Sequence, residues 1–238
     1  MLWFKAWMET RARFLVSLCG MVALSTYFVY QEGQGVKKYA GLDWYYRSLH
    51  MGHGLIAAMW VAAVMFLMMG GLLREKAMGT SSFTLSLPVG RTRLMEVRIL
   101  LGLCQAMVLA AIPWGAMFLV SGVTGKATSI YQAAFHVVLL AGGGLVFFAV
   151  ALLVSSLVEG EYTAPAVSFG ILFADVIALD DRRFSAFSPW GFMVGSKYFD
   201  RRTNLLVGPI PWLHVTASVL LAALMTAIAI RVIQRREF

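Results

Sequence analysis

The chain has 238 residues, of which 60% are hydrophobic and 13% are charged. A water-soluble domain carries about a quarter charged residues, so the composition excludes an ordinary soluble domain and indicates a surface that faces lipid. The net charge of +8 comes from 20 Lys and Arg residues, mostly in short clusters beside apolar runs, a pattern that suits anionic lipid headgroups better than nucleic acid.

The first 13 residues have the pattern of an amphipathic helix. Lys5, Glu9 and Arg13 share one helical face, and Trp3 and Trp7 lie on the other side. This pattern favours an interfacial helix in the headgroup plane, before the chain turns into the bilayer. The alternative is a helical extension of the first span.

Six apolar runs follow along the chain. Lipid offers the backbone no hydrogen-bond partners, so runs near 20 residues predict membrane-spanning helices rather than barrel strands of about 10 residues. The runs cover residues 14–30, 51–73, 99–123, 132–157, 164–179 and 212–232. The sequence therefore predicts an all-α integral membrane protein with six transmembrane helices in one domain, residues 1–238. The alternative is five spans, with the fifth run re-entrant.

A polar and basic segment, residues 74–93, joins the second and third runs. Thr80 or Ser81 can cap a short helix there, and Pro88 ends it at Leu87. Between them, Phe83, Leu85 and Leu87 present apolar side chains. An exposed apolar helix flanked by charge is what a partner's groove holds, whereas the alternative is a helix lying against the headgroups.

Glycine and proline residues predict features of the later runs. Gly142, Gly143 and Gly144 lie within the fourth run, where they favour close helix packing over a phosphate site. Pro113 is expected to kink the third helix, and Pro165 stands in the first turn of the fifth, where its missing donor is tolerated.

Asp175 is the acidic residue that lies clearly inside an apolar run. A charge at the bilayer centre costs roughly 2.5–3.5 kcal/mol on insertion scales, and intramembrane acids are often functional. Asp175 either pairs with Arg182 and Arg183 or lies along a translocation path.

All four histidines fall at the outer ends of the even-numbered runs; they are His50, His53, His136 and His214. His50 and His53 could share a helical face that binds metal or haem. Interfacial histidines need no ligand, however, and neither carboxylate nor thiolate spacing supports a metal site. We expect no metal, and a membrane-embedded metal- or haem-binding protein or enzyme is the alternative function.

The long connection over residues 180–211 contains an apolar stretch, FSAFSPWGFMV at 184–194. It is too apolar for a solvated loop and too short to span the bilayer. It therefore predicts re-entrant or short helices at the outer mouth of the bundle.

Taken together, these features resemble the ABC-2 type permeases of ABC transporters. Ser188-Pro189-Trp190 lies where such permeases carry re-entrant outer helices, the tail Arg235-Arg236-Glu237-Phe238 is similar to theirs, and the amphipathic N-terminus matches their elbow helix. Between the second and third runs, the matching residues are Glu75, Gly79, Thr80, Leu85, Ser86, Leu87, Pro88, Arg91, Leu94 and Arg98.

The resemblance implies the permease subunit of an ATP-driven exporter, in which a short cytoplasmic coupling helix docks onto an ATPase. The implied ATPase-coupling interface comprises Glu75, Gly79, Thr80, Phe83, Leu85, Leu87, Pro88 and Arg91. Two ATPase subunits would bind ATP and Mg, and a second permease copy or a paralogue would complete the complex. The implied location is the cell (inner or plasma) membrane, multi-pass, with both termini cytoplasmic.

The chain itself has no match to the phosphate-binding loop G-x-x-x-x-G-K-[ST]. The nearest approach is Gly125-Lys126, where Ala127 replaces the hydroxyl residue and Val120 the first glycine. We therefore expect no catalytic residue, no cofactor bound by this chain and no nucleic-acid partner. Few ionisable residues lie inside the runs, which disfavours ion-coupled transport; a non-transporting assembly subunit is a third possibility.

Overall fold

In a computed structural model of the protein, the described residues are almost all helical and contain no β-strand. They are residues 2–38, 42–68, 90–123, 130–158, 163–178, 188–195, 197–198, 200 and 206–235. The helices are α1 (Leu2–Lys38), α2 (Leu42–Met68), α5 (Arg91–Val123), α6 (Ile130–Leu157), α7 (Thr163–Ala178), α8 (Pro189–Val194) and α9 (Trp212–Arg235). The all-α prediction is confirmed for this part of the chain.

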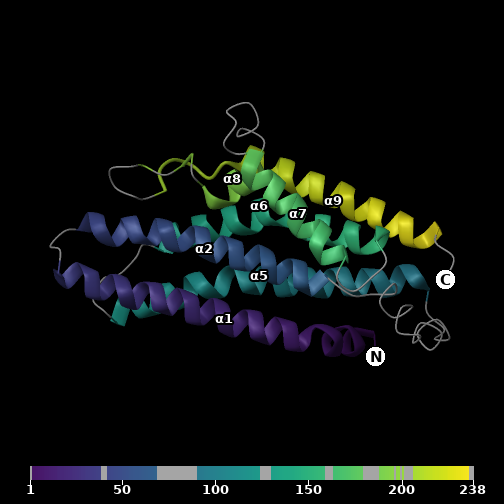
Figure 1. Cartoon of the computed structure of the whole chain (residues 1–238), viewed down its shortest axis with the longest axis horizontal. Helices are drawn as coiled ribbons and strands as arrows, with labels where there is room; N and C mark the ends of the chain where they lie inside the picture. The colour runs from purple at the N-terminus through teal and green to yellow at the C-terminus, as the bar shows by residue number, and fades with distance from the viewer. Residues whose placement is uncertain are drawn as a thin grey trace.

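The long helices form a bundle in which α1, α2, α5 and α6 each run antiparallel to the helix before (Figure 1). The start of α5 meets the end of α9, where the Gln234 side-chain amide donates a hydrogen bond to Thr92 Oγ1 at 3.1 Å. We call this the terminal end of the bundle; it holds the start of α1, the end of α2, the start of α5 and the end of α9. We call the opposite part the distal half; it holds the start of α2, the end of α5, the start of α6 and the start of α9.

Three of the described helices are long and apolar enough to cross a membrane: Thr92–Leu119, Ile130–Leu157 and Trp212–Arg235. At 1.5 Å per residue, 24 to 28 residues extend about 36 to 42 Å, more than the roughly 30 Å of bilayer hydrocarbon. Two shorter apolar helices, His53–Met68 and Thr163–Ile177, accompany them. These helices are consistent with the predicted membrane protein.

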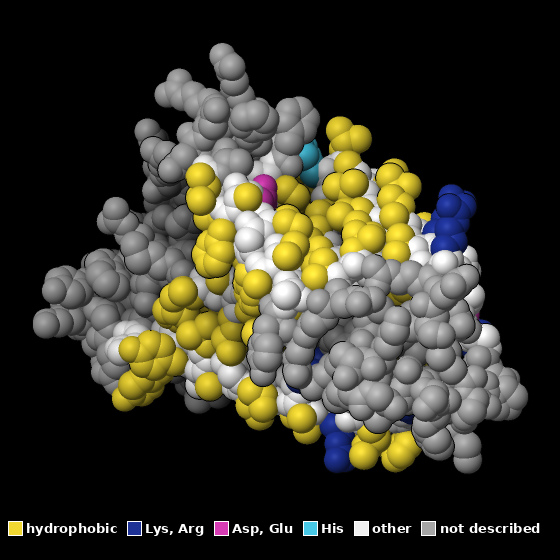
Figure 2. All heavy atoms as spheres, turned by 45° about the vertical axis from the view of Figure 1, so that its right-hand side comes forward, with side chains coloured by type: hydrophobic (Ala, Val, Ile, Leu, Met, Phe, Trp, Pro, Cys, Tyr) yellow, Lys and Arg dark blue, Asp and Glu magenta, His cyan; other side chains and the backbone are white. Residues whose placement is uncertain are grey.

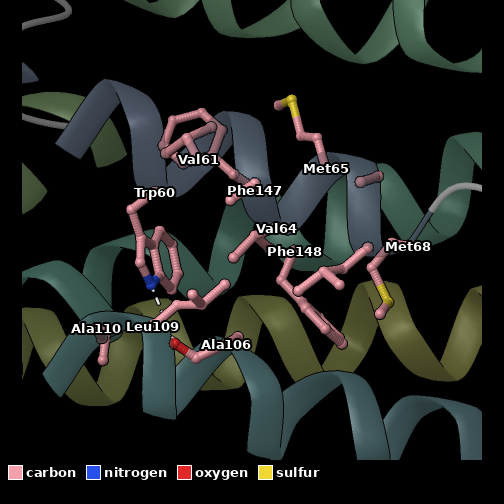
Figure 3. Close-up of a cluster of buried hydrophobic side chains, with 14 of the residues drawn as sticks. Trp60, Val61, Val64, Met65, Met68, Ala106, Leu109, Ala110, Phe147 and Phe148 are labelled. Carbon is pink, nitrogen blue, oxygen red and sulfur yellow. Dashed lines mark hydrogen bonds between the residues drawn. The ribbon is translucent and has the colours of Figure 1, made fainter. Parts of the chain in front are cut away.

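Helix α6 forms the centre of the bundle, and α2, α5, α7, α8 and α9 pack around it. Close to its middle, Phe147 and Phe148 join a buried cluster with Trp60 of α2 and with α5 (Figure 3). The Trp60 indole N–H donates a hydrogen bond to the Ala106 carbonyl at 3.0 Å. The indole N–H of Trp60 is thus satisfied although the residue is fully buried.

Large apolar side chains cover much of the outer surface (Figure 2). Helix α9 is the clearest case, with Leu213 80% exposed and Leu220 65% exposed. An exposed apolar face of this extent is unfavourable in water but is the ordinary surface of a helix in lipid.

The structure differs from the prediction at the N-terminus. Residues 2–13 form no separate interfacial helix, because α1 is continuous from Leu2 to Lys38. The polar face packs on α5: the Gln105 amide donates to Thr10 Oγ1 at 2.9 Å, and Glu9 pairs with Arg98 at 3.6 Å. These side chains contact α5, and residues 2–13 continue directly into the helix that covers the first apolar run.

The prediction that the glycine run allows close helix packing is confirmed, since each of the three glycines lies against a different helix. A Cβ on Gly142 would lie 3.3 Å from Val215 of α9, and one on Gly143 would lie 3.0 Å from the backbone N of Met193 in α8. A Cβ on Gly144 would overlap the indole ring of Trp60 in α2.

The helices extend beyond several of the apolar runs. Helix α5 begins at Arg91 rather than at residue 99, and α2 begins at Leu42 rather than at residue 51. An apolar run marks the part of a helix suited to hydrocarbon, whereas the hydrogen-bonded helix continues into polar flanks. Pro165 lies in the first turn of α7, as expected. Pro113 lies within α5, and the kink expected there stays a prediction.

Candidate functional site

Most of the predicted ATPase-coupling interface lies outside the described residues; these are Glu75, Gly79, Thr80, Phe83, Leu85, Leu87 and Pro88. Arg91, the remaining residue, is the first residue of α5. The described helices on either side, α2 and α5, meet α1 at the terminal end.

Polar contacts tie the first part of α1 to both of these helices. Arg13 donates a hydrogen bond to the Phe66 carbonyl at 3.1 Å, within three residues of the last described residue of α2. Arg13 therefore ties the first part of α1 to the last described turn of α2.

Glu9 holds α1 to α5 at the same end. Its carboxylate lies 3.6 Å from Arg98, which is 11% exposed, and 3.7 Å from Lys5 one turn away on α1. One acid thus balances two cations in a partly desolvated seam, where an unpaired charge would be costly.

In the distal half, Asp175 caps the short helix α8. Its Oδ2 accepts a hydrogen bond from the Trp190 backbone N–H at 3.0 Å, and Ser188 accepts one from the Gly191 N–H at 3.1 Å. These acceptors satisfy amides that the first turn of a helix leaves without partners. The partners proposed from the sequence, Arg182 and Arg183, lie outside the described residues.

Replacing Asp175 tests this capping role. We expect Asp175→Ala to cost about 1–2 kcal/mol of stability and to speed amide exchange in the peptide 188–195, because the Trp190 N–H loses its acceptor. Asp175→Asn keeps an acceptor oxygen and should lose less. Hydrogen exchange and thermal unfolding of the purified protein measure both effects, and unchanged exchange in Asp175→Ala would exclude the cap.

The other end of α8 is fixed by backbone geometry and by a histidine. Gly195 adopts a left-handed conformation with φ 71°, which glycine tolerates without strain, and its N–H donates to the Phe192 carbonyl. The Met193 carbonyl lies 3.3 Å from His53 Nε2 of α2. A carbonyl oxygen only accepts, so Nε2 carries the hydrogen in this contact.

His53 belongs to a buried cluster with Trp114 of α5 and His136 of α6. The Trp114 and His136 rings stack at 4.2 Å and 23°, and the two imidazole centroids lie 4.7 Å apart. All three residues are at most 8% exposed. His136 Nδ1 lies 2.7 Å from the Gln132 carbonyl, so this nitrogen is also the donor.

The sequence singles out the histidines as candidate site residues but gives no sign of Trp114, the residue on which they pack. His53 and His136 were both expected at outer helix ends, and the structure brings them together. His214 does not join them but stacks on Phe192 at 5.7 Å and 22°. Trp114 has no sequence signal of this kind, because it is one apolar residue among many in α5.

The described part of the chain contains no group of three or more His, Cys, Asp or Glu side chains that could hold a metal ion. The side chain of His50, the predicted partner of His53, lies outside the described residues. The cluster therefore offers two imidazoles and an indole N–H, which suit proton binding and hydrogen bonding.

Two described residues that follow α8 in the chain, Tyr198 and Leu206, lie against the start of α6. Gln132 donates to the Leu206 carbonyl at 2.8 Å and accepts from the Leu206 N–H at 3.1 Å. Tyr198 packs near Phe135 and Phe192, and burial raises the pKa of its phenol above the ordinary value. This cover keeps α8 against α6.

No protein-family model and no curated protein sequence matches the chain, so its function is inferred from these residues and their geometry.

Proposed function

We propose that the chain is the membrane-spanning permease subunit of an ATP-driven ABC-2 type transporter, an exporter with six spans. The observation that carries this proposal is the position of the helices that flank residues 69–89. Phe66 of α2 and Arg98 of α5 both bind the first part of α1 at the terminal end. A segment joining α2 and α5 from that end would face the same side as both termini, as a coupling helix requires.

The charges of the described residues support a cytoplasmic terminal end. Its acidic side chains are Glu9 and Glu96, which pair with arginines of α5. Its basic side chains are more numerous and are Lys5, Arg11, Arg13, Arg93, Arg98, Arg231 and Arg235. An excess of Lys and Arg beside the spans is typical of the cytoplasmic side.

The packing supports spans beyond the three long apolar helices. Helices α1 and α2 lie along α5 over much of their length (Figure 1). Helix α7 has 16 residues, about 24 Å, and falls short of the hydrocarbon thickness by about four residues. Its partner α8, held by Asp175, would line the remaining depth, where protein satisfies the irregular backbone.

In this proposal, ATP closes a separate pair of ATPase subunits, and the segment around Thr80–Pro88 transmits their movement to α2 and α5. Arg13 and Glu9 tie α1 to these same two helices. The three helices would therefore move together relative to α6 and α9, and the bundle would alternate its opening.

Charge substitutions in the coupling segment test the proposal. We expect Leu85→Asp or Leu87→Asp to reduce co-purification with the ATPase subunit at least about tenfold, because a carboxylate in an apolar groove remains unpaired. The ATPase is identified by mass spectrometry and by its phosphate-binding loop, and ATP hydrolysis is measured on the same preparation.

Ser86→Asp is the matched control, since it adds the same charge between the two leucines at a polar position. Wild-type protein that never associates with an ATPase, together with intact transport in Leu85→Asp and Leu87→Asp, would overturn the proposal.

The approach of His53 and His136 favours one second candidate, a metal- or haem-binding membrane protein that uses the outer-side histidines. Stoichiometric zinc, copper or iron in the purified protein, lost on His53→Gln and His136→Gln substitution, would support it. Metal-free protein that still assembles with an ATPase would exclude it.

A further inference from the structure

Helix α8 is capped at each end by a side chain from another helix, and the chemistry of the two caps differs. Asp175 of α7 accepts from Trp190 at the N-terminal end, and His53 of α2 donates to the Met193 carbonyl at the C-terminal end. Helix N-termini favour negative charge and C-termini favour positive charge, through their unpaired N–H and carbonyl groups. The carboxylate already has the favourable sign, whereas imidazole acquires it on protonation.

The His53 contact survives protonation. In the neutral ring, Nε2 carries the hydrogen that points to the Met193 carbonyl, so a proton would be added at Nδ1. The bond to Met193 then becomes charge-assisted, and such bonds are shorter and roughly twice as strong as neutral ones.

His136 and Trp114 make the cluster able to hold a positive charge. His136 stacks on the Trp114 ring at 4.2 Å, and an aromatic face attracts a cation. His136 also keeps its Nδ1–H on the Gln132 carbonyl whether it is neutral or charged. A proton on His53 acts directly on the Met193 carbonyl, whereas a proton on His136 acts on α8 only through His53, whose ring centroid lies 4.7 Å away.

The pair accommodates one proton rather than two. Its ring centroids are 4.7 Å apart and both residues are at most 8% exposed, so two imidazolium ions would repel each other with little screening by water. We propose that His53 and His136 form a one-proton site in the distal half, and that proton uptake there tightens α8 against Gly143 of α6.

The position of His136 along α6 places the one-proton site where protons can reach it from the distal side. From His136 to Leu157, the last residue of α6, there are 157 − 136 = 21 residues, about 32 Å of helix. This distance matches the hydrocarbon thickness of roughly 30 Å, so with the end of α6 at one boundary the pair lies near the other. Histidine is also the side chain that ordinarily titrates between about pH 5 and 8.

Other titratable groups near α8 have different positions. Among the described residues, Asp175 of α7 binds the opposite end of α8, and His214 of α9 stacks on Phe192. The titratable residues Lys197, Tyr198 and Asp200 follow α8 in the chain. The described residues of α8 itself include no titratable side chain. These groups supply the controls.

Hydrogen exchange of the peptide 188–195 tests the proposal in the full chain, purified in lipid nanodiscs without an ATPase. After correction for the intrinsic pH dependence of exchange, we expect about tenfold slower exchange at pH 5.5 than at pH 8, the change expected when a neutral hydrogen bond becomes charge-assisted. His53→Gln keeps a donor for the Met193 carbonyl but takes no proton, so its corrected exchange should not change with pH.

The matched control is His214→Gln, which removes another histidine in contact with α8 and should keep the wild-type response. Asp175→Asn should speed exchange at both pH values and keep their ratio. Exchange that becomes faster at pH 5.5, or a response that persists in a His53→Gln, His136→Gln double variant, would overturn the proposal.

Nitrogen-15 histidine NMR of the His214→Gln protein provides a measurement that needs no change at the pair. We expect His53 and His136 together to take up one proton between pH 8 and pH 5. Uptake of none or of two would contradict the one-proton site. Because no ATPase is present, either result leaves the transport proposal to its own test.

Discussion

The free energy of unfolding of the Gly144→Ala protein is expected to be about 3 kcal/mol lower than that of the wild type. The added Cβ would overlap the ring of Trp60, which is fully buried and whose indole N–H is bound to the Ala106 carbonyl at 3.0 Å. The ring must therefore move, which adds the strain of overpacking, about 1–3 kcal/mol, to the cost of a weakened buried hydrogen bond. Reversible unfolding in mixed micelles, followed by tryptophan fluorescence, measures the loss.

Two variants make this expectation specific to the Trp60 contact. Gly142→Ala places its Cβ 3.3 Å from Val215, a contact that a small shift relieves, and should stay within about 1 kcal/mol of the wild type. Trp60→Phe removes part of the ring, so Gly144→Ala should cost less in that background, with a coupling of about 0.5–3 kcal/mol. Equal stability of the two alanine variants would show that α2 does not pack on Gly144.

The sequence predicts the helices well because each helix depends on the residues of its own apolar run. In lipid, the length of an apolar run decides whether the backbone can satisfy itself, and the runs at 132–157 and 164–179 match α6 and α7 to within two residues. The glycine run was also interpretable, since close approach of a neighbouring helix is a property of the glycines themselves. At α5 the apolar run marks the hydrocarbon segment alone, and the helix begins eight residues earlier, at Arg91.

The partners across the bundle could not be predicted, because helix rotation is set by packing rather than by any one run. No pattern links Asp175 to the Trp190 N–H, or Trp114 to two histidines on other helices. The N-terminal segment shows the same limit. Its polar face of Lys5, Glu9 and Arg13 fits equally a headgroup surface and a polar seam against another helix, and the structure pairs Glu9 of this face with Arg98 of α5.

That seam gives α1 a mechanical role within the proposed transporter. Arg13 binds the end of α2, and Glu9 binds the start of α5, so α1 bridges the two helices that would carry the coupling segment. A polar bond between spans contributes modestly to stability, since measured values average about 0.6 kcal/mol. In the proposed transporter, its directionality would nonetheless decide which helices move as one unit.

Breaking the Glu9–Arg98 pair is expected to lower the free energy of unfolding by about 2–3 kcal/mol. Glu9→Lys would place a third cation beside Lys5 and Arg98, the latter 11% exposed, and removal of one partner from a buried pair costs about 3–5 kcal/mol, here reduced because Glu9 is 36% exposed. Thermal unfolding in detergent measures the loss. Arg98→Glu alone should be similarly unstable, because two carboxylates would then face each other.

The exchanged pair Glu9→Lys, Arg98→Glu restores opposite charges between α1 and α5 and should recover most of the lost stability, leaving the weaker interaction with Lys5 unfavourable. Glu96→Lys is the matched control: it removes a pair with Arg93, which is 68% exposed, so its effect should stay below about 1 kcal/mol. If the exchanged protein is no more stable than the single variants, Glu9 and Arg98 do not hold α1 to α5. If stability recovers and ATP hydrolysis remains coupled to transport, α1 moves with the helices that flank the coupling segment.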